Sequence, residues 1–234
     1  GDWQRSFTRD AGLGQAAKGS GRILLNWTPT DRLTLDFNAN GWIDRSDTQA
    51  SQLVAFRAQT PSSIPLLPDV FSSPLTPDNA RAADWNPLRD YARDDNFYQL
   101  SLKANYDMGG NVDLTSITAY SHYDTHAFND RDGMVPINYE YTTDGNIKSI
   151  YQELRLSGRQ PGLNWSVGGN YRKDTVFDQQ DNDLTRATNS YAAGTKFNIA
   201  RVFSDQDIKT WAVFGDGELD IVRSLSIVAG VRYT

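Results

Sequence analysis

Residues 96–124 constrain the fold more than any other stretch, because apolar and polar side chains alternate there with a period of two. This period is typical of a β-strand, in which successive side chains point to opposite faces. In the first half of the stretch the even positions are apolar or aromatic and the odd positions are polar: Tyr98, Leu100, Leu102, Ala104 and Tyr106 alternate with Gln99, Ser101, Lys103, Asn105 and Asp107. The stretch therefore begins with a two-faced strand.

A tight turn and a second strand follow. Residues 108–111 include two glycines, which reach positive φ without a steric penalty and so suit a sharp reversal. Residues 112–123 are rich in β-branched and aromatic side chains, which favour a strand. Each arm is longer than the usual ~5 to 6 residues and close to the ~9 to 11 of a transmembrane β-strand. We predict a long β-hairpin that is suited to a bilayer.

The same pattern recurs along the chain. Further hairpins are predicted over residues 21–39, 146–177 and 208–233, which makes about eight strands. Residues 1–20 are expected to form a loop, residues 51–59 a short helix, and residues 57–95, 125–146 and 178–207 long polar loops. Short turns at one end and long loops at the other are the layout of outer-membrane barrels. The predicted fold is all-β: part of an antiparallel up-and-down transmembrane β-barrel with long extracellular loops.

Three places interrupt simple alternation, at Trp42, Ile150 and the pair Trp211 and Phe214. Bulges or aromatic side chains that face the barrel lumen would each explain such an interruption.

Composition excludes several classes of protein. No run approaches the ~18 apolar residues of a transmembrane helix, which excludes a helical membrane protein but leaves a barrel open. The net charge of −6 gives no support for nucleic-acid binding. The chain has no cysteine, and its first residues lack the pattern of a signal peptide, so we expect its start to be internal to a longer precursor.

Three sequence phrases point to a known family: GRILLNWTPTDRLTLDFNAN, the pair VDLTSITAYSHYD and SIYQELRLSG, and the terminal LSIVAGVRYT. They resemble the barrel of TonB-dependent receptors of the Gram-negative outer membrane. The resemblance implies a barrel of roughly 22 strands that surrounds an N-terminal plug. Residues 1–234 are then expected to be one part of the barrel, with the plug domain absent from this chain.

The resemblance also implies a function. It predicts energy-coupled uptake of a bulky nutrient. A ferric siderophore is the nutrient expected first, and cobalamin, oligosaccharides and other metal chelates are the next candidates. The expected partners are outer-membrane lipid, the TonB complex acting through the plug, and the nutrient itself. Two other interpretations stay open: a self-contained eight-stranded outer-membrane barrel with an adhesive or enzymatic role, and a soluble β-sandwich that binds carbohydrate.

No constellation for catalysis, a cofactor or a metal emerges from the sequence. His122 and His126 have a spacing that suits a metal on a helix, but on a strand it separates them by roughly 13 Å. Residues 130–133 and 181–183 resemble pieces of calcium loops without the remaining ligands, so we expect solvated loop tips. No Ser/His/Asp set or carboxylate pair is placed together by spacing. We predict a protein that is not an enzyme.

Ligand contact is expected on the long loops, where aromatic and arginine side chains are the usual anchors. For each candidate residue, packing among the loops is the alternative role. The candidate residues are Phe71, Trp85, Arg89, Tyr91, Arg93, Phe128 and Tyr139.

Overall fold

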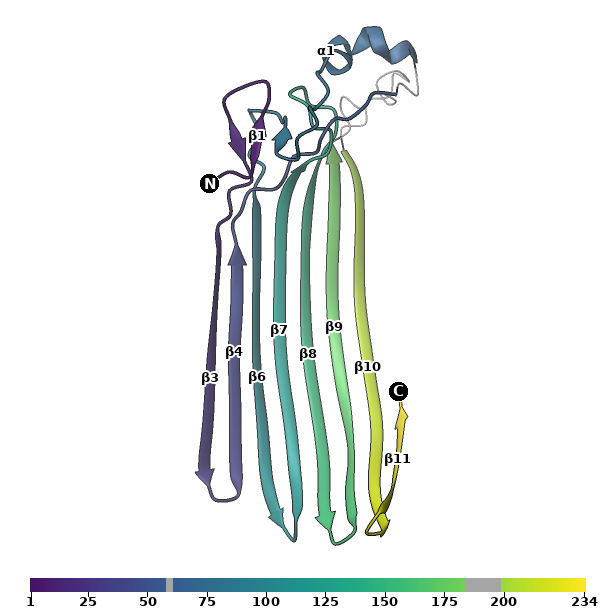
Figure 1. Cartoon of the computed structure of the whole chain (residues 1–234). Coiled ribbons are helices and arrows are strands. Elements are labelled where there is room, and N and C mark those ends of the chain that lie inside the picture. The colour runs from purple at the N-terminus through teal and green to yellow at the C-terminus, as the bar shows by residue number, and fades with distance from the viewer. Residues whose placement is uncertain (58–60, 184–198) are drawn as a thin grey trace.

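A computed structural model of the chain describes residues 1–57, 61–183 and 199–234. One antiparallel sheet of eight long strands dominates it, with tight turns at one end and a cluster of loops at the other (Figure 1). Each strand pairs with the next along the chain, except that β4 pairs with β6. The strands are β3 (Lys18–Thr30), β4 (Leu33–Asp44), β6 (Arg93–Gly109), β7 (Val112–Asp130), β8 (Glu140–Gln160), β9 (Leu163–Asp183), β10 (Ile199–Val222) and β11 (Leu225–Tyr233). The predicted hairpins are confirmed.

The turn between β6 and β7 has the geometry that its sequence predicts. Gly110 and Asn111, the two residues between the strands, have φ values of 66° and 62°. Positive φ at both central positions is the type I′ arrangement, whose twist matches that of paired strands. Glycine and asparagine tolerate this region better than other residues do.

Two predicted loops are wrong in extent, because the strands continue through much of them. β7 runs to Asp130 and β8 begins at Glu140, so residues 131–139 alone form the connection. β9 extends to Asp183 and β10 begins at Ile199, while residues 184–198 lie outside the described part of the chain. The polar residues at these strand ends remain in a regular ladder, which shows that pairing with neighbours outweighs their low strand propensity.

The loop segments contain short elements that the sequence prediction placed differently. Residues 1–20 include β1 (Gln4–Ser6) and β2 (Gly12–Leu13), which form a small sheet with β5 (Ala82–Ala83), so the prediction of a plain loop is wrong. Residues 51–57 contain no helix, and residues 58–60 lie outside the described part. Instead, a 3₁₀ helix η1 (Pro61–Leu66) and one helical turn α1 (Pro68–Phe71) follow, each beginning at a proline, which suits a first helical position.

The strand register sorts the sheet into an apolar face and a polar face. On the apolar face of β3, β4 and β6 the ladders place apolar residues opposite apolar ones, as in Leu25 opposite Phe37 and Phe37 opposite Leu102. The other face carries amides, hydroxyls and charges that bond across strands: Asn26 donates to Asp36 at 2.6 Å and Thr115 to Asn105 at 3.0 Å. The apolar face includes Ile23, Leu25, Trp27, Leu35, Phe37, Leu100, Leu102, Leu154, Leu156, Val167, Val213 and Val231.

The interruptions of alternation are explained by this register. No ladder shifts at Trp42, Ile150, Trp211 or Phe214; the shifts in the ladders among the described long strands lie beside the turns. Trp42 and Phe214 are aromatic side chains on the polar face, which confirms the second explanation for both. Ile150 and Trp211 remain on the apolar face.

The apolar face is exposed, as expected of a surface that faces lipid. Leu25 is 58% and Val213 53% exposed. On β6 the apolar band runs from Tyr106 to Tyr98, about 26 Å along the strand at ~3.3 Å per residue. At the roughly 40° tilt of barrel strands this spans about 20 Å of height, close to the apolar band of about 25 Å in such barrels. Aromatic pairs mark its loop-side edge: Tyr98 with Tyr120 at 5.9 Å between ring centroids, and Trp211 with Tyr233 at 5.5 Å. Among the described residues, no helix is long and apolar enough to cross a membrane.

This architecture removes two interpretations that the sequence left open. The order β11-β10-β9-β8-β7-β6-β4-β3 leaves β3 and β11 as edges of an open sheet, which is a partial barrel and not a closed eight-stranded one. The described strands also form no second large sheet that would pack on the first, so the β-sandwich prediction is wrong. The two-faced sheet is the wall of a larger barrel.

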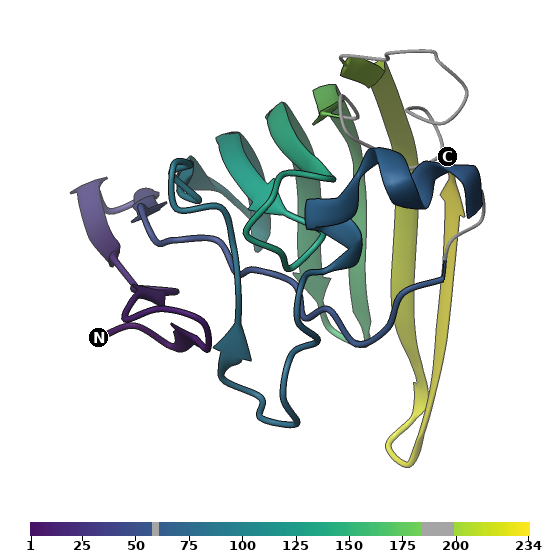
Figure 2. The ribbon, with the colours of Figure 1, turned by 90° about the horizontal axis from the view of Figure 1, so that it is seen from above.

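Apart from Ala212 on β10, the buried apolar residues lie in the loop segments, which gather to one side of the strand ends (Figure 2). We call residues 1–17, 45–57, 61–92 and 131–139 the loop cap. One buried cluster joins Leu13, Ala50, Ala83, Trp85 and Tyr91, and a smaller one joins Leu67, Val70 and Met134. The cap is therefore a packed structure with its own core.

Candidate functional site

Three aromatic side chains lie together on the polar face near the loop end of β4, β6 and β7. Trp42 stacks on Phe97 with ring centroids 6.0 Å apart, and it meets Tyr123 at 5.8 Å. The ladder places them in one row, with Trp42 opposite Phe97 and Phe97 opposite Tyr123. Aromatic surface on an otherwise polar wall is a suitable contact for a flat or ring-bearing ligand.

A layer of charged residues lies next to this cluster, on the loop side. Asp44 and Asp95 are opposite each other and almost buried, at 5% and 7% exposure. The Lys18 ammonium is 2.8 Å from Asp44, and the Arg93 guanidinium is 4.0 Å from Asp44 and 3.8 Å from Asp95. Thr125 donates to Asp95 at 2.6 Å. The carboxylates are thus held by partners from three strands, β3, β6 and β7.

A groove of about 520 Å³ opens where the aromatic cluster meets this layer. Six of the residues that line it share the polar face: Lys18, Ser20, Trp42, Asp44, Arg93 and Asp95. The small Ser20 leaves the Trp42 ring uncovered. The groove therefore offers aromatic, cationic and anionic contacts, and its volume is that of a small-molecule site.

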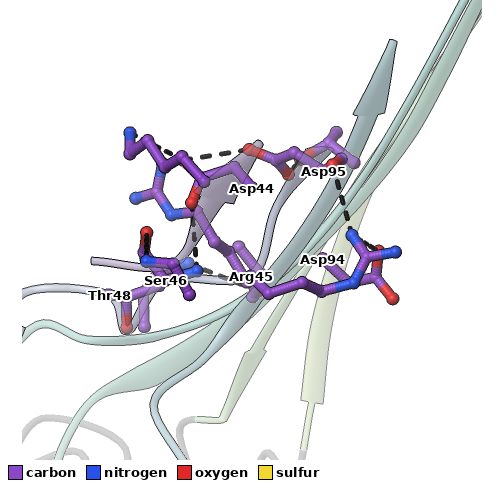
Figure 3. A network of polar contacts seen from close by, with 12 residues as sticks. Asp44, Arg45, Ser46, Thr48, Asp94 and Asp95 are labelled. Carbon is purple, nitrogen blue, oxygen red and sulfur yellow. Dashed lines mark hydrogen bonds and ion pairs between the residues drawn. The ribbon is translucent and has the colours of Figure 1, made fainter. Parts of the chain in front are cut away.

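The end of β4 connects this layer to the loop cap (Figure 3). Asp44 accepts a hydrogen bond from the Ser46 backbone at 3.0 Å, and the Ser46 hydroxyl accepts one from Ala17 at 3.0 Å. Arg45 reaches to the ion pair with Asp94 and donates to the Asp95 carbonyl at 3.2 Å. Thr48 then donates to the Phe128 carbonyl at 2.6 Å. The groove and the cap form one hydrogen-bonded structure.

Four of the seven residues predicted for ligand contact come together where the cap meets the loop end of β7. Tyr91 stacks on Phe128 with centroids 5.3 Å apart, and Trp85 belongs to the same cluster. The Arg89 guanidinium lies 5.7 Å from the Phe128 ring and pairs with Glu140 at 3.3 Å. Trp85 is 5% and Tyr91 1% exposed, so both pack within the cap in this structure. Ligand contact by these residues stays a prediction.

The other three lie apart from that group. Phe71 packs on the smaller cluster and meets Phe56 at 5.8 Å. Tyr139 donates to Asn182 at 2.9 Å. Arg93 is the one member that lines the groove. The seven predicted residues are therefore distributed over four places, and the binding roles of these three likewise stay predictions.

Buried acids stabilise the cap. Asp132 accepts backbone hydrogen bonds from Met134 at 2.9 Å, Asn138 at 2.8 Å and Tyr139 at 2.6 Å. Asp130 accepts them from Gly133 at 2.7 Å and Ser51 at 3.3 Å. Both carboxyls are buried, so the prediction that residues 130–133 form a solvated loop tip is wrong. A carboxylate supplied with backbone N–H groups shapes a tight loop without a cation.

Burial raises the pKa of these acids. It raises the pKa of Asp130 to about 8, and the nearby Asp132 charge adds to the effect. It also raises the pKa of Asp132, against the three backbone hydrogen bonds that lower it. The Glu140 pKa is raised by burial, while its hydrogen bond from the Tyr91 hydroxyl and the Arg89 charge oppose the rise. All three groups lie beyond the apolar band.

The two histidines pair with aspartates near the loop ends of their strands. His122 lies 2.9 Å from Asp124, and His126 pairs with Asp144 on the next strand. Among the described residues, no group of three or more His, Asp or Glu side chains is arranged to hold a metal ion.

Sequence reasoning missed most of the groove. Trp42 drew notice as an interruption of alternation, and that signal identifies a lumen-side aromatic residue. No comparable sequence signal marks the charged groove residues, because charged residues at strand ends are common. These residues are Lys18, Asp44 and Asp95. Only pairing of β3, β4 and β6 brings them together.

Comparison with known proteins agrees with this geometry. Residues 26–234 match the family model described as TonB dependent receptor-like, beta-barrel. A comparison with curated proteins gave no match. Among solved structures, the siderophore receptor PiuA from Acinetobacter baumannii is similar, with a TM-score of 0.54 and 9% identity over 94% of this chain and 38% of that receptor.

A second solved structure gives the same result. The ferric yersiniabactin uptake receptor FyuA from Yersinia pestis has a TM-score of 0.50 and 10% identity over 95% of this chain and 38% of that receptor. At such identities these likenesses show the fold, and the chain spans less than two thirds of either receptor. The match to the family model covers most of the chain, and the chain therefore belongs to the TonB-dependent receptor family, in which it corresponds to part of the β-barrel.

Proposed function

We propose that this chain is part of the barrel wall of an outer-membrane receptor for energy-coupled uptake of a bulky nutrient, a ferric siderophore in the first instance. The TonB complex, acting through a plug domain, would supply the energy. Membership in the family supports a role in transport rather than catalysis. The named functions of PiuA and FyuA favour iron chelates over cobalamin and oligosaccharides.

The polar-face groove is the observation that supports this role most directly. It lies on the wall that would face the lumen, next to the loop cap, where an incoming ligand arrives. Ferric catecholates, one class of such chelates, present planar aromatic rings and a net negative charge. Trp42 and Phe97 suit the planar groups, and Lys18 and Arg93 suit the charge. We assign the groove to initial ligand contact.

Uptake of radioactive iron by a deletion strain tests the proposal. Cells without the complete receptor are given defined ferric catecholates, hydroxamates and carboxylates under iron limitation, and the gene is restored on a plasmid. We expect uptake of one class to be lost and then restored. If every iron chelate enters normally while a cobalamin or an oligosaccharide does not, the transport role stands and iron is rejected.

A substitution tests the groove itself. Trp42→Ala should weaken binding of the transported chelate by about 1 to 2 kcal/mol, or about five- to thirtyfold, since an aromatic contact is lost. Phe214→Ala is the matched control, because Phe214 is an aromatic residue of the same face. It lies on β10, far from the groove, and contacts Arg232 on the neighbouring β11. Equal effects of the two substitutions would contradict the assignment of the groove.

A further inference from the structure

A row of basic residues runs along the loop-side edge of the apolar band. On β7 to β10, which lie side by side (Figure 1), the last apolar-face residues of the band are Tyr120, Ile150, Tyr171 and Trp211. Two positions further toward the loops, the same face of each strand carries a basic residue: His122, Lys148, Lys173 and Lys209, in strand order. Four successive strands thus change from apolar to basic at the same step.

This row belongs to one edge of the band. At the turn end, the same face of these four strands carries Val112, Gly158, Leu163 and Gly217, none of them charged. Lysines that served solubility alone would have no reason to gather at one edge. The asymmetry indicates a negative partner at the loop-side surface of the membrane.

The lysines are placed where they repel one another. Lys173 lies directly opposite Lys209 in the ladder between β9 and β10. Like charges at directly opposite positions destabilise a sheet. Asp207 pairs with Lys173 at 3.3 Å, but neither Lys148 nor Lys209 forms an ion pair with any residue in the described ranges. Both are exposed, so they are free to bind an external anion. We call Lys148, Lys173 and Lys209 the basic belt.

We propose that the basic belt binds the phosphate groups of the glycolipid in the outer leaflet of the outer membrane. In that lipid, the lipid A portion carries phosphates on sugars directly above the acyl chains. Tyr171 and Trp211 would contact the upper acyl chains, and the lysines one step above them would meet the phosphates. The inference rests on the proposed outer-membrane location, from which it takes the identity of the lipid.

Lipid binding by the complete receptor in detergent tests this inference. Lipid A with two phosphates, the same lipid with both phosphates removed, and phosphatidylglycerol are added separately, and bound lipid is counted by native mass spectrometry. Each lysine is expected to contribute about fivefold in affinity. We therefore expect the Lys148→Gln/Lys173→Gln/Lys209→Gln variant to bind two-phosphate lipid A at least tenfold more weakly than the parent.

The control is Lys103→Gln, which removes a lysine from the polar face and should leave lipid binding unchanged. Equal binding of lipid A with and without phosphate, or an unchanged affinity in the triple variant, would overturn the proposal. Phosphatidylglycerol that binds as tightly as lipid A would overturn the choice of lipid. The measurement is made in micelles, so its failure is distinguishable from a failure of the proposed cellular location.

Discussion

Asp84 holds the N-terminal segment of the loop cap against its core. The residue is 2% exposed, and its carboxylate accepts hydrogen bonds from Ser6 at 2.6 Å, Thr8 at 2.6 Å and Arg9 at 2.9 Å. Arg9 also lies over the Trp85 ring at 4.7 Å. A single buried acid thus joins residues that are more than 70 positions apart in the chain.

Asp84→Asn should therefore loosen the first residues of the cap. The amide keeps the shape but loses the charge, and we expect a loss of about 1 to 3 kcal/mol in the free energy of local opening. Hydrogen exchange of the backbone amides of β1 and β2 in the complete receptor measures it. Asp2→Asn is the control, because Asp2 forms an exposed pair with Arg5 at 3.7 Å that should contribute little. Similar exchange rates in both variants would show that Asp84 does not hold the N-terminal segment against the core of the cap.

The buried Asp130 should make the cap sensitive to pH. Its pKa is about 8 in the folded cap against an ordinary 3.8, so the folded cap holds the proton more tightly than the opened cap does. The stabilisation is complete below pH 3.8 and is lost as the pH rises through about 8. Between pH 6 and pH 8 this loss amounts to at most about 2 kcal/mol.

Hydrogen exchange of the 131–139 amides at pH 6 and pH 8, corrected for intrinsic rates, measures this loss. The carboxyls of Asp132 and Glu140 face the same region and contribute in the same direction, since burial raises both of their pKa values. Asp130→Asn should flatten most of the dependence. An Asp130→Asn protein that retains the full pH dependence would assign it to the other two acids.

At the scale of the element, each long strand presents one face to lipid and the other to the barrel lumen. Residues 101 and 102 are neighbours on β6, yet Ser101 pairs with Asn38 on the polar face and Leu102 with Phe37 on the apolar face. Their environments should therefore differ sharply, although their positions along the strand are almost the same.

Leu102→Lys and Ser101→Lys form a matched pair that tests this arrangement. A lysine on the lipid face near the middle of the bilayer costs about 2 to 4 kcal/mol, whereas the lumen face hydrates it. We expect Leu102→Lys to lower the free energy of unfolding by that amount and Ser101→Lys to change it by less than about 1 kcal/mol. Urea titration of the complete receptor in lipid vesicles measures both. The reverse order would invert the assignment of the faces.

A glycine on β9 also shows how the strands pack. A Cβ atom added at Gly168 would lie 2.7 Å from the Leu154 carbonyl and 2.8 Å from the Phe214 ring. At Gly215 the nearest atom would be 3.5 Å away. Gly168→Ala should therefore destabilise the barrel by about 1 to 3 kcal/mol, and Gly215→Ala by clearly less, in the same urea titration. Equal values would mean that the Leu154 backbone and the Phe214 ring both shift without cost.

At the scale of the whole molecule, the sheet has one end of short turns and one end covered by the cap. Asp31 lies in the turn between β3 and β4, and Asp78 lies in an exposed part of the cap. Residues 1–234 contain no cysteine, so once any cysteine in the rest of the receptor is replaced, one introduced thiol at each position reports its side of the membrane.

In intact cells, a membrane-impermeant maleimide should label Asp78→Cys and leave Asp31→Cys unlabelled until the outer membrane is permeabilised. Labelling of Asp31→Cys alone would reverse the orientation. Labelling of neither, before permeabilisation, would contradict the proposed surface location.

Much of the sheet follows from the sequence alone. A period of two with one apolar set, as in residues 98–106, has a single physical solution, because a slip of one residue would turn every apolar side chain to the wrong face. Glycine and asparagine between β6 and β7 determine that turn locally. These signals depend on near neighbours, so they are visible in the chain before it folds.

The strand ends, the loop cap and the groove were decided by tertiary structure. Polar residues such as Asp178 and Gln180 have low strand propensity, and only pairing with β8 and β10 keeps them in the ladder. Trp85 and Tyr91 resemble exposed anchors until the 1–17 segment and β7 cover them. Asp44 and Lys18 meet because β3 and β4 pair, and Asp95 joins them only after a 48-residue connection brings β6 alongside β4. Contacts between residues so far apart produce no periodic pattern in the sequence. Which residues meet depends on how whole strands pair, and not on their near neighbours in the chain.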